Sequence, residues 1–325
     1  MREYLSIKKS DLHIHLEGSV EISTFKRLAE KNKIDLLRPV KFKTRNLEIP
    51  APKLDFFSSN FSGNFLEFIK LYIKISETIC EAEDIVSIID AYAQNAEREK
   101  VTYAEMYVTP SSLLELNLTE EELTQGLIKA QQLAKNKYQL EIKWIFDIVR
   151  GNIKDQNFTL DLATKLREIG VEIIALGLAG PEMGNLSYHF KDAFNKARDR
   201  GFNIYAHAGE TAGAESIWDT IENIAPQRIG HGIRAIDDEN LIKEIIKREI
   251  ILEVCPWSNI YLEVCTEKNH PLKQLVERGV KVVICSDDPG IFGKTLNDNL
   301  KLAEELGLSE KQLSTIIEFS NYRHK

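Results

Sequence analysis

Two histidines stand two residues apart at the end of an apolar segment. His13 and His15 lie in the segment DLHIH, residues 11–15. Side chains alternate along a β-strand, so both imidazoles would lie on one face if this segment is a strand. Two imidazoles that converge on one point suit a borderline-soft divalent metal. The alternative is a pair of surface histidines.

Further histidines and a glutamate follow later apolar segments. His207 ends one such segment and is followed by Ala-Gly-Glu210, whereas His231 lies between two glycines. A desolvated Glu210 would have a raised pKa and could carry a proton at neutral pH. The alternative is a carboxylate at a helix N-terminus. His231 could be a metal ligand, an acid/base or an electrostatic stabiliser.

Two adjacent carboxylates, Asp287 and Asp288, follow the apolar segment VVIC and precede Pro289. In a regular strand they would face opposite ways, so both reach one pocket only if the chain bends. Pro289 favours such a departure from regular structure. One carboxylate could then bind a metal while the other bonds to a ligand. The alternative is a simple turn, in which Asp-Asp-Pro is common.

Eight apolar segments could position these side chains as parallel strands. Most are near-continuous apolar runs, as expected for strands that helices cover on the outside. Helical patterns fill the gaps, and this alternation predicts an α/β fold, a (β/α)8 TIM barrel. A doubly wound open sheet is the alternative, although no Gly-rich nucleotide fingerprint follows the first strand. The predicted strands are 11–15, 102–108, 142–149, 173–178, 203–207, 227–230, 250–254 and 281–285.

The gap between the first two predicted strands is much longer than one crossover helix needs. We expect an insertion at about residues 22–100, with a Phe-rich segment at 54–75. Long insertions on the C-terminal face of a barrel are usually functional, which favours a helical lid over a pocket. The alternative is an extra helical pair that packs its own small core. The absence of a linker or repeat predicts a single domain over residues 1–325.

The C-terminal ends of barrel strands form one face, where active sites lie. Four of the seven histidines fall at such ends, as do Glu210, Asp287 and Asp288. We therefore predict a single-metal site on this face. No functional role is predicted for the remaining histidines, which fall on helices or at the tail: His189, His270 and His324.

Composition and charge exclude several other classes of protein. The formal net charge is -8, with 43% hydrophobic and 28% charged residues. The acidic balance argues against a nucleic-acid partner, and no stretch approaches the ~20 apolar residues that span a bilayer. The N-terminal segment has no apolar signal region, and four irregularly spaced cysteines predict reduced thiols. We expect a cytoplasmic protein with neither a nucleic-acid nor a membrane partner; protein partners are not predicted.

Six motifs in order resemble the adenosine deaminase family of zinc amidohydrolases: DLHIHLEGS, LGLAGPE, YAHAGE, RIGHG, EVCPWSN and SDDP. They cover residues 11 to about 293. The resemblance implies one Zn²⁺ per chain and a small-molecule purine nucleoside as the partner. Zinc lowers the pKa of water and so provides a nucleophile near neutral pH. The implied ligands are His13, His15, His207 and Asp287.

The resemblance also implies roles for the other site residues. Glu210 is the proton shuttle to purine N1, which prevents negative charge from building on the ring during attack at C6. His231 orients and stabilises the attacking hydroxide. Asp288 accepts a hydrogen bond at purine N7, and the Gly180 N–H meets N3. His15 and Glu17 complete the set of implied substrate-binding residues. Helical spacing and the resemblance together place Phe65, Leu66 and Ile69 on an apolar wall of the pocket.

Two positions bear on the choice of substrate. Glu17 stands where adenosine-specific members commonly have Asp, and Gly177 replaces an Asp that is frequent in them. The HLEG form is similar to adenine and 6-aminodeoxyfutalosine deaminases, whereas LAGPE and RIGHG are similar to nucleoside-acting members. The resemblance therefore implies deamination of adenosine, and with it 2′-deoxyadenosine, to inosine or its deoxy form plus ammonia in purine salvage. The alternatives are 6-aminodeoxyfutalosine or adenine as substrate, or a non-catalytic nucleoside-binding relative.

Overall fold

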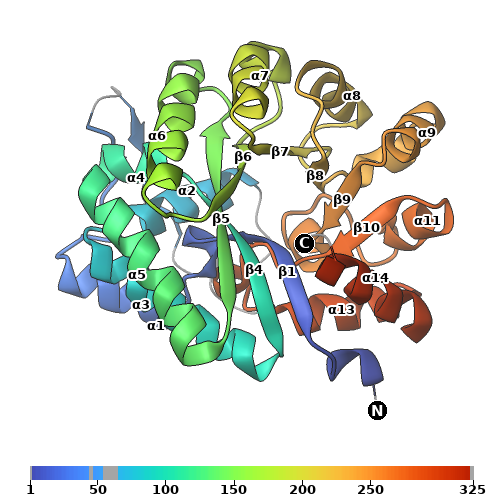
Figure 1. The fold of residues 1–325 in the computed structure, drawn as a ribbon, viewed down its shortest axis with the longest axis horizontal. Helices are drawn as coiled ribbons and strands as arrows, with labels where there is room; N and C mark the ends of the chain where they lie inside the picture. Colours follow the sequence, from blue (N-terminus) through green and yellow to red (C-terminus); the bar gives the residue numbers. More distant parts are fainter. Residues whose placement is uncertain (1, 44–46, 54–64, 323–325) are drawn as a thin grey trace.

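A computed structural model describes residues 2–43, 47–53 and 65–322. Eight parallel strands form one sheet whose spatial order follows the chain (Figure 1). This arrangement confirms the predicted barrel, and each predicted strand coincides with an observed one to within a few residues. The strands are β1 (Lys9–His15), β4 (Val101–Val108), β5 (Glu141–Val149), β6 (Ile173–Ala179), β7 (Asn203–Ala208), β8 (Arg228–His231), β9 (Ile251–Val254) and β10 (Lys281–Ile284).

Helices alternate with the strands and surround the sheet. Three short helices, α4, α10 and α12, each begin with a proline soon after a strand, where the missing N–H costs nothing. In the described part of the chain, no helix has the length and apolar character to cross a membrane. The helices are α1 (Ile22–Lys31), α2 (Phe65–Glu77), α3 (Ala82–Arg98), α4 (Pro110–Leu116), α5 (Glu120–Tyr138), α6 (Gln156–Glu168), α7 (Lys191–Asp199), α8 (Ala214–Asn223), α9 (Glu239–Lys247), α10 (Pro256–Tyr261), α11 (Leu272–Glu277), α12 (Pro289–Phe292), α13 (Leu296–Glu305) and α14 (Glu310–Tyr322).

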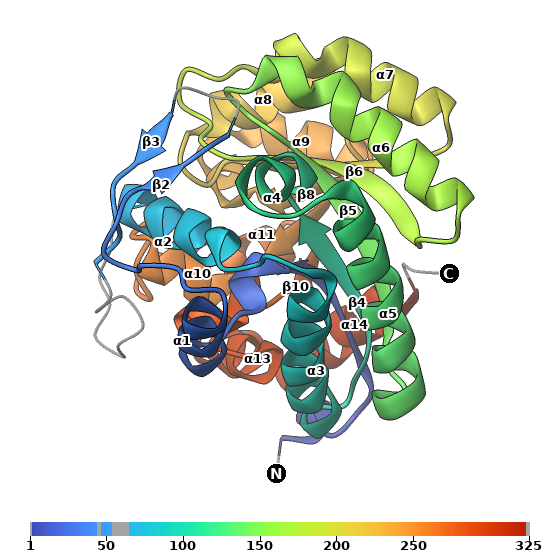
Figure 2. The same ribbon diagram turned by 90° about the vertical axis from the view of Figure 1, so that its left-hand side faces the viewer.

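The long segment between β1 and β4 contains α1, a small hairpin, α2 and α3. The hairpin pairs β2 (Val40–Lys41) with β3 (Glu48–Ile49), and it lies beside α2 in Figure 2. Helix α3 instead packs against α5 and β4 on the outside of the barrel. Residues 54–64 of the Phe-rich segment lie outside the described residues. A lid that opens and closes therefore stays a prediction.

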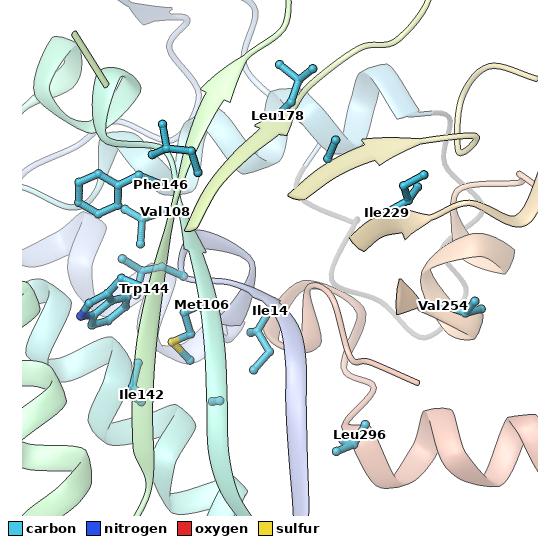
Figure 3. Close-up of a cluster of buried hydrophobic side chains, with 14 of the residues drawn as sticks. Ile14, Met106, Val108, Ile142, Trp144, Phe146, Leu178, Ile229, Val254 and Leu296 are labelled. Carbon is cyan, nitrogen blue, oxygen red and sulfur yellow. The ribbon is translucent and has the colours of Figure 1, made fainter. Parts of the chain in front are cut away.

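Both faces of the strands are buried, which explains their near-continuous apolar sequences. Outward-facing side chains such as Met106 and Trp144 pack toward the helices (Figure 3). Trp144 Nε1 also donates a hydrogen bond to Gln131 of α5 over 2.9 Å. A separate small cluster includes Leu12 and Tyr103. The helix-facing core holds the barrel wall in place and leaves its other face free for polar groups.

The two ends of the sheet meet where β1 adjoins the segment after β10. His15 N donates to Asp287 O over 2.9 Å, and Asp287 N donates to His13 O over 2.9 Å. Helix α14 packs across β1 and β10. These backbone bonds bring the first and last strands together and favour the barrel over the open sheet that the sequence left as an alternative.

The inside of the barrel contains a buried charged cluster. Arg228 of β8 pairs with Glu105 of β4, and its Nε lies 2.7 Å from Glu253 Oε1 of β9. The guanidinium also stacks 3.7 Å from the centroid of the Tyr205 ring. Burial raises the pKa of both glutamates, and the Arg228 charge opposes that shift. One cation therefore balances two carboxylates that water does not reach.

Replacing Arg228 with Met tests the importance of this balance. We expect Arg228→Met to lower the free energy of unfolding by about 3–5 kcal/mol, because it leaves buried carboxylates without a cation. Urea unfolding measures the change. The control is Arg200→Met, whose Asp161 partner is 66% exposed; such surface pairs contribute about 0–1 kcal/mol. Equal effects of the two substitutions would contradict this account.

Candidate functional site

A cavity of about 140 Å³ opens at the C-terminal ends of the strands. Its polar lining comes from strand ends and the loops after them, and its apolar lining comes largely from α2. A larger cavity of about 600 Å³ is lined by Asp11, Tyr92 and Glu99, and includes none of the predicted site residues. The smaller cavity is therefore the candidate site, although it is not the largest. Its lining includes His15, Phe65, Phe68, Ile69, Tyr72, Asp147, Gly180, His207, Glu210, His231, Asp287 and Asp288.

Four predicted ligands converge beside this cavity. His15 Nε2 lies 3.2 Å from His207 Nε2. Asp287 Oδ1 lies 3.5 Å from His13 Nε2 and 3.5 Å from His15 Nε2. Zinc–nitrogen bonds of about 2.0–2.1 Å in a tetrahedron place neighbouring ligand atoms about 3.3 Å apart. Three imidazoles and one carboxylate suit zinc in their chemistry. The ligand atoms of His13, His15 and Asp287 lie within 4.8 Å of one another, and His207 adjoins this group through His15, although it also groups with His13 and His231.

The protonation states of these groups also suit a metal. Burial lowers the pKa of His13 and His15 well below the usual value, and that of His207 to about 4. All three imidazoles are therefore neutral, as metal ligands must be. Cys255 also lies close to Asp287. Burial raises the pKa of its thiol well above the usual value, so the thiol stays protonated and is a poor ligand.

Carboxylate and carbonyl oxygens orient two of the imidazoles. Glu253 Oε2 lies 2.6 Å from His13 Nδ1 and accepts the Tyr107 hydroxyl over 2.9 Å. His207 Nδ1 lies 3.3 Å from the Leu178 carbonyl oxygen. His13 Nε2 is buried without a hydrogen-bond partner among the described residues, so it is available to a metal. Glu253 was not among the residues predicted from the sequence; its signal was a carboxylate within the apolar strand ILEV.

Unusual backbone conformations aim the site residues. Asp287 and His231 have φ of 66° and 61°, which non-glycine residues rarely adopt and which cluster at functional sites. The conformation of Asp287 provides the bend that two adjacent carboxylates require, and Asp288 lines the same cavity. A Cβ at Gly18 would lie 1.7 Å from Asp288 Oδ1, so only glycine fits there.

His231 contacts both the acid and a predicted ligand. Its Nε2 lies 3.5 Å from Glu210 Oε1 and 3.8 Å from Asp287 Oδ2. Asn259 Nδ2 lies 3.1 Å from His231 Nδ1. With this amide donating, the proton of the neutral imidazole is on Nε2 and points toward the carboxylates. His231 can therefore donate a hydrogen bond to an oxygen in the cavity.

Glu210 is buried on the loop before α8, which begins at Ala214, so it is not the first residue of that helix. Burial raises its pKa well above the usual value, and the charges of Asp287 and Glu182 add to the shift. Burial therefore favours the protonated form of Glu210, the form that can donate a proton. Both properties match the predicted proton shuttle.

The Glu182 carboxylate holds the loop that carries Glu210. It accepts the backbone N–H groups of Gly209, Glu210 and Thr211 over 2.7, 2.9 and 2.8 Å. Glu182 belongs to the LAGPE motif, but no role was predicted for it from the sequence. Three successive amides aimed at one carboxylate fix the loop, and so fix where the Glu210 side chain enters the cavity.

Glu17 does not line the cavity directly. It is fully buried, and its Oε2 accepts the Tyr72 hydroxyl over 2.8 Å while Oε1 accepts the Thr109 N–H over 3.4 Å. Tyr72 stands between it and the space where a ligand would bind. Gly180, at the end of β6, does line the cavity with φ of 93°.

The predicted apolar wall is partly correct. Phe65 and Ile69 line the cavity, but Leu66 is 62% exposed and is not part of the lining. Of the histidines without a predicted role, His189 is exposed and His270 is buried with Nδ1 accepting the Leu272 N–H over 3.2 Å. His324 lies outside the described residues.

The chain is similar to known deaminases over almost its whole length. The family model for adenosine deaminase matches residues 8–320. An aminodeoxyfutalosine deaminase of Streptomyces coelicolor is 32% identical over 95% of this chain and 78% of that protein. An adenine deaminase of Pseudomonas putida is 33% identical over 94% of each chain.

A solved structure shows the same architecture. The crystal structure of adenine deaminase from Arthrobacter aurescens superposes with a TM-score of 0.83 at 25% identity, and covers 97% of this chain and 93% of that one. Together with the matched family model and the relatives above 30% identity, this similarity establishes the class of protein. The chain belongs to the adenosine deaminase family.

Proposed function

We propose that this protein is a zinc-dependent hydrolase that deaminates a 6-aminopurine nucleoside, with adenosine and 2′-deoxyadenosine as substrates. The observation that carries the proposal is the buried Glu210 carboxyl, 3.5 Å from His231 and beside the predicted ligand set, whose pKa burial raises well above its usual value. Proton donation next to a metal site is what hydrolytic loss of ammonia from a purine requires. When bound, zinc supplies a nucleophile near neutral pH by lowering the pKa of water.

Other residues of the chain transfer the proton, stabilise the developing charge and hold the purine ring. Glu210 donates its proton to purine N1, so that the ring stays neutral when C6 becomes tetrahedral. His231 Nε2–H stabilises the negative oxygen that forms at C6. The Gly180 N–H meets N3, and the apolar side chains of α2 exclude water from the ring. The amino group takes up the proton of the new C6 hydroxyl and leaves as ammonia while C6 becomes a carbonyl, and the other proton of the attacking water restores the one that Glu210 gave to N1.

Asp288 acts as a hydrogen-bond donor in this proposal. Burial raises its pKa well above the usual value, and the neighbouring Asp287 charge raises it further. A protonated Asp288 donates to purine N7, whose lone pair only accepts. The resemblance implied that Asp288 accepts a hydrogen bond at N7; because N7 carries no hydrogen, we propose the opposite direction, with Asp288 as the donor.

A second candidate substrate is 6-aminodeoxyfutalosine, or the free base adenine. Relatives at 32–33% identity carry the names aminodeoxyfutalosine deaminase and adenine deaminase. Glu17, which accepts a hydrogen bond from Tyr72, is the glutamate of the HLEG motif, and this motif favours these alternatives. All the candidates share the 6-aminopurine ring, so the roles above are the same for each.

The wider setting is part of the same proposal. We place the enzyme in the cytoplasm, in purine salvage, as a single domain with residues 22–100 forming a lid insertion. The four cysteines form no disulfide, which supports a reducing compartment: Cys80, Cys255, Cys265 and Cys285. The apolar wall that α2 gives the cavity supports the lid.

A substrate panel tests the proposed activity. Zinc-loaded protein should release ammonia from adenosine with the highest kcat/KM among adenosine, 2′-deoxyadenosine, 6-aminodeoxyfutalosine and adenine. Removing the metal with a chelator should abolish release, because no nucleophile remains, and added Zn²⁺ should restore it. A preference for another compound would replace adenosine as the substrate. No ammonia from any of the four would reject the proposed function.

The proton-shuttle role predicts a specific defect. Glu210→Gln should lower kcat by about 10²–10⁴-fold, because the amide cannot donate the proton to N1. Zinc content, measured by elemental analysis, should not change. The control is Glu215→Gln on the exposed first turn of α8, which should retain wild-type turnover. Near-wild-type activity of Glu210→Gln would assign the shuttle to another group.

A further inference from the structure

The three imidazoles of the ligand set differ in how they are supported. Glu253 orients His13 and the Leu178 carbonyl orients His207. The Nδ1 atom of His15 is buried, and none of the described residues forms a hydrogen bond with it. Metal-binding imidazoles almost always donate the second ring N–H to an oxygen, which fixes the ring. His15 therefore requires a partner that the sequence analysis did not identify.

Asp147 of β5 is the nearest carboxylate to this nitrogen. It is fully buried, and neither carboxylate oxygen has a hydrogen-bond partner among the described residues. Its Oδ2 lies 4.0 Å from His15 Nδ1, longer than a hydrogen bond but within ion-pair range. Burying a carboxylate without a partner is costly, so its presence here needs a reason. Two unsatisfied groups that face each other provide one.

The neighbouring strand leaves space for Asp147. Gly177 of β6 is its partner in the parallel register. A Cβ at position 177 would lie 2.0 Å from Asp147 Oδ1 and 3.2 Å from Tyr107 Cε1. Any side chain at 177 would therefore displace the carboxylate from its position opposite His15. The glycine on one strand and the aspartate on the next are complementary.

We propose that Asp147 is the positioning residue of His15: its carboxylate accepts the Nδ1–H and holds Nε2 toward the metal. The inference rests on the proposed zinc site and adds a residue to it. Glu253 does the same for His13 from the other side of the barrel. Such outer partners typically contribute 10- to 100-fold to metal affinity.

Competition with a chromophoric chelator for Zn²⁺ tests the proposal. Asp147→Asn should weaken zinc binding by about 10- to 100-fold. Gly177→Ala keeps Asp147 but displaces it, so it should weaken binding in the same direction. The control is Asp161→Asn, a carboxylate that is 66% exposed on α6, which should bind zinc as the wild type does.

Thermal unfolding of the metal-free proteins separates positioning from a purely structural role. Metal-free Asp147→Asn should be at least as stable as metal-free wild type, because the substitution removes a buried carboxylate that no cation in the described part of the chain balances. Its gain in Tm on adding zinc should be smaller.

Three outcomes would overturn the inference. If the wild type binds no zinc, the proposed function fails together with it. If the wild type binds zinc and Asp147→Asn binds it equally well, only this inference fails. An unchanged zinc affinity with a raised KM would show that Asp147 contacts the substrate instead.

Discussion

The site depends on one buried cation, Arg228, which lies between Glu105 and Glu253 inside the barrel. Water cannot stabilise these carboxylates, so the guanidinium must. Glu253 uses one oxygen for Arg228 and the other for His13 Nδ1, and in this way the charge balance of the barrel interior extends to the metal site. The orientation of the first imidazole is therefore set by residues from three other strands, a long way from it in sequence.

Closure of the barrel positions the other groups of the proposed metal site. The hydrogen bonds that join β1 to the segment after β10 involve the backbone of His13, His15 and Asp287. Three groups of the proposed metal site thus meet because the first and last strands of the sheet meet. The left-handed conformation of Asp287 belongs to the same seam, and it is maintained because the surrounding structure is closely packed. Closure of the barrel therefore brings these three groups together.

The sequence predicted the strands well because apolar β-type runs bounded by polar residues are a strong signal for buried parallel strands. Once the strands were placed, the polar residues at their C-terminal ends could be predicted to lie together, because those ends share one face of a barrel. The sequence did not predict the supporting carboxylates, because Glu105, Asp147 and Glu253 each sit within an apolar strand and do not disturb its pattern. A lone charge within such a strand is itself a signal, since charged residues are almost never fully buried unless paired.

The periodicity of apolar residues also gave limited information about short helices and about which side of a helix faces the cavity. The four- to seven-residue helices that begin with proline are too short for a helical pattern, and the side of α2 that faces the cavity depends on packing, which placed Leu66 outside.

The most direct test of the account is anomalous X-ray diffraction at the zinc edge from crystals of the zinc-loaded protein. The account predicts one anomalous peak per chain, within bonding distance of His13, His15 and His207 Nε2 and of Asp287 Oδ1. A peak elsewhere in the chain, or no peak from protein that deaminates its substrate, would contradict it.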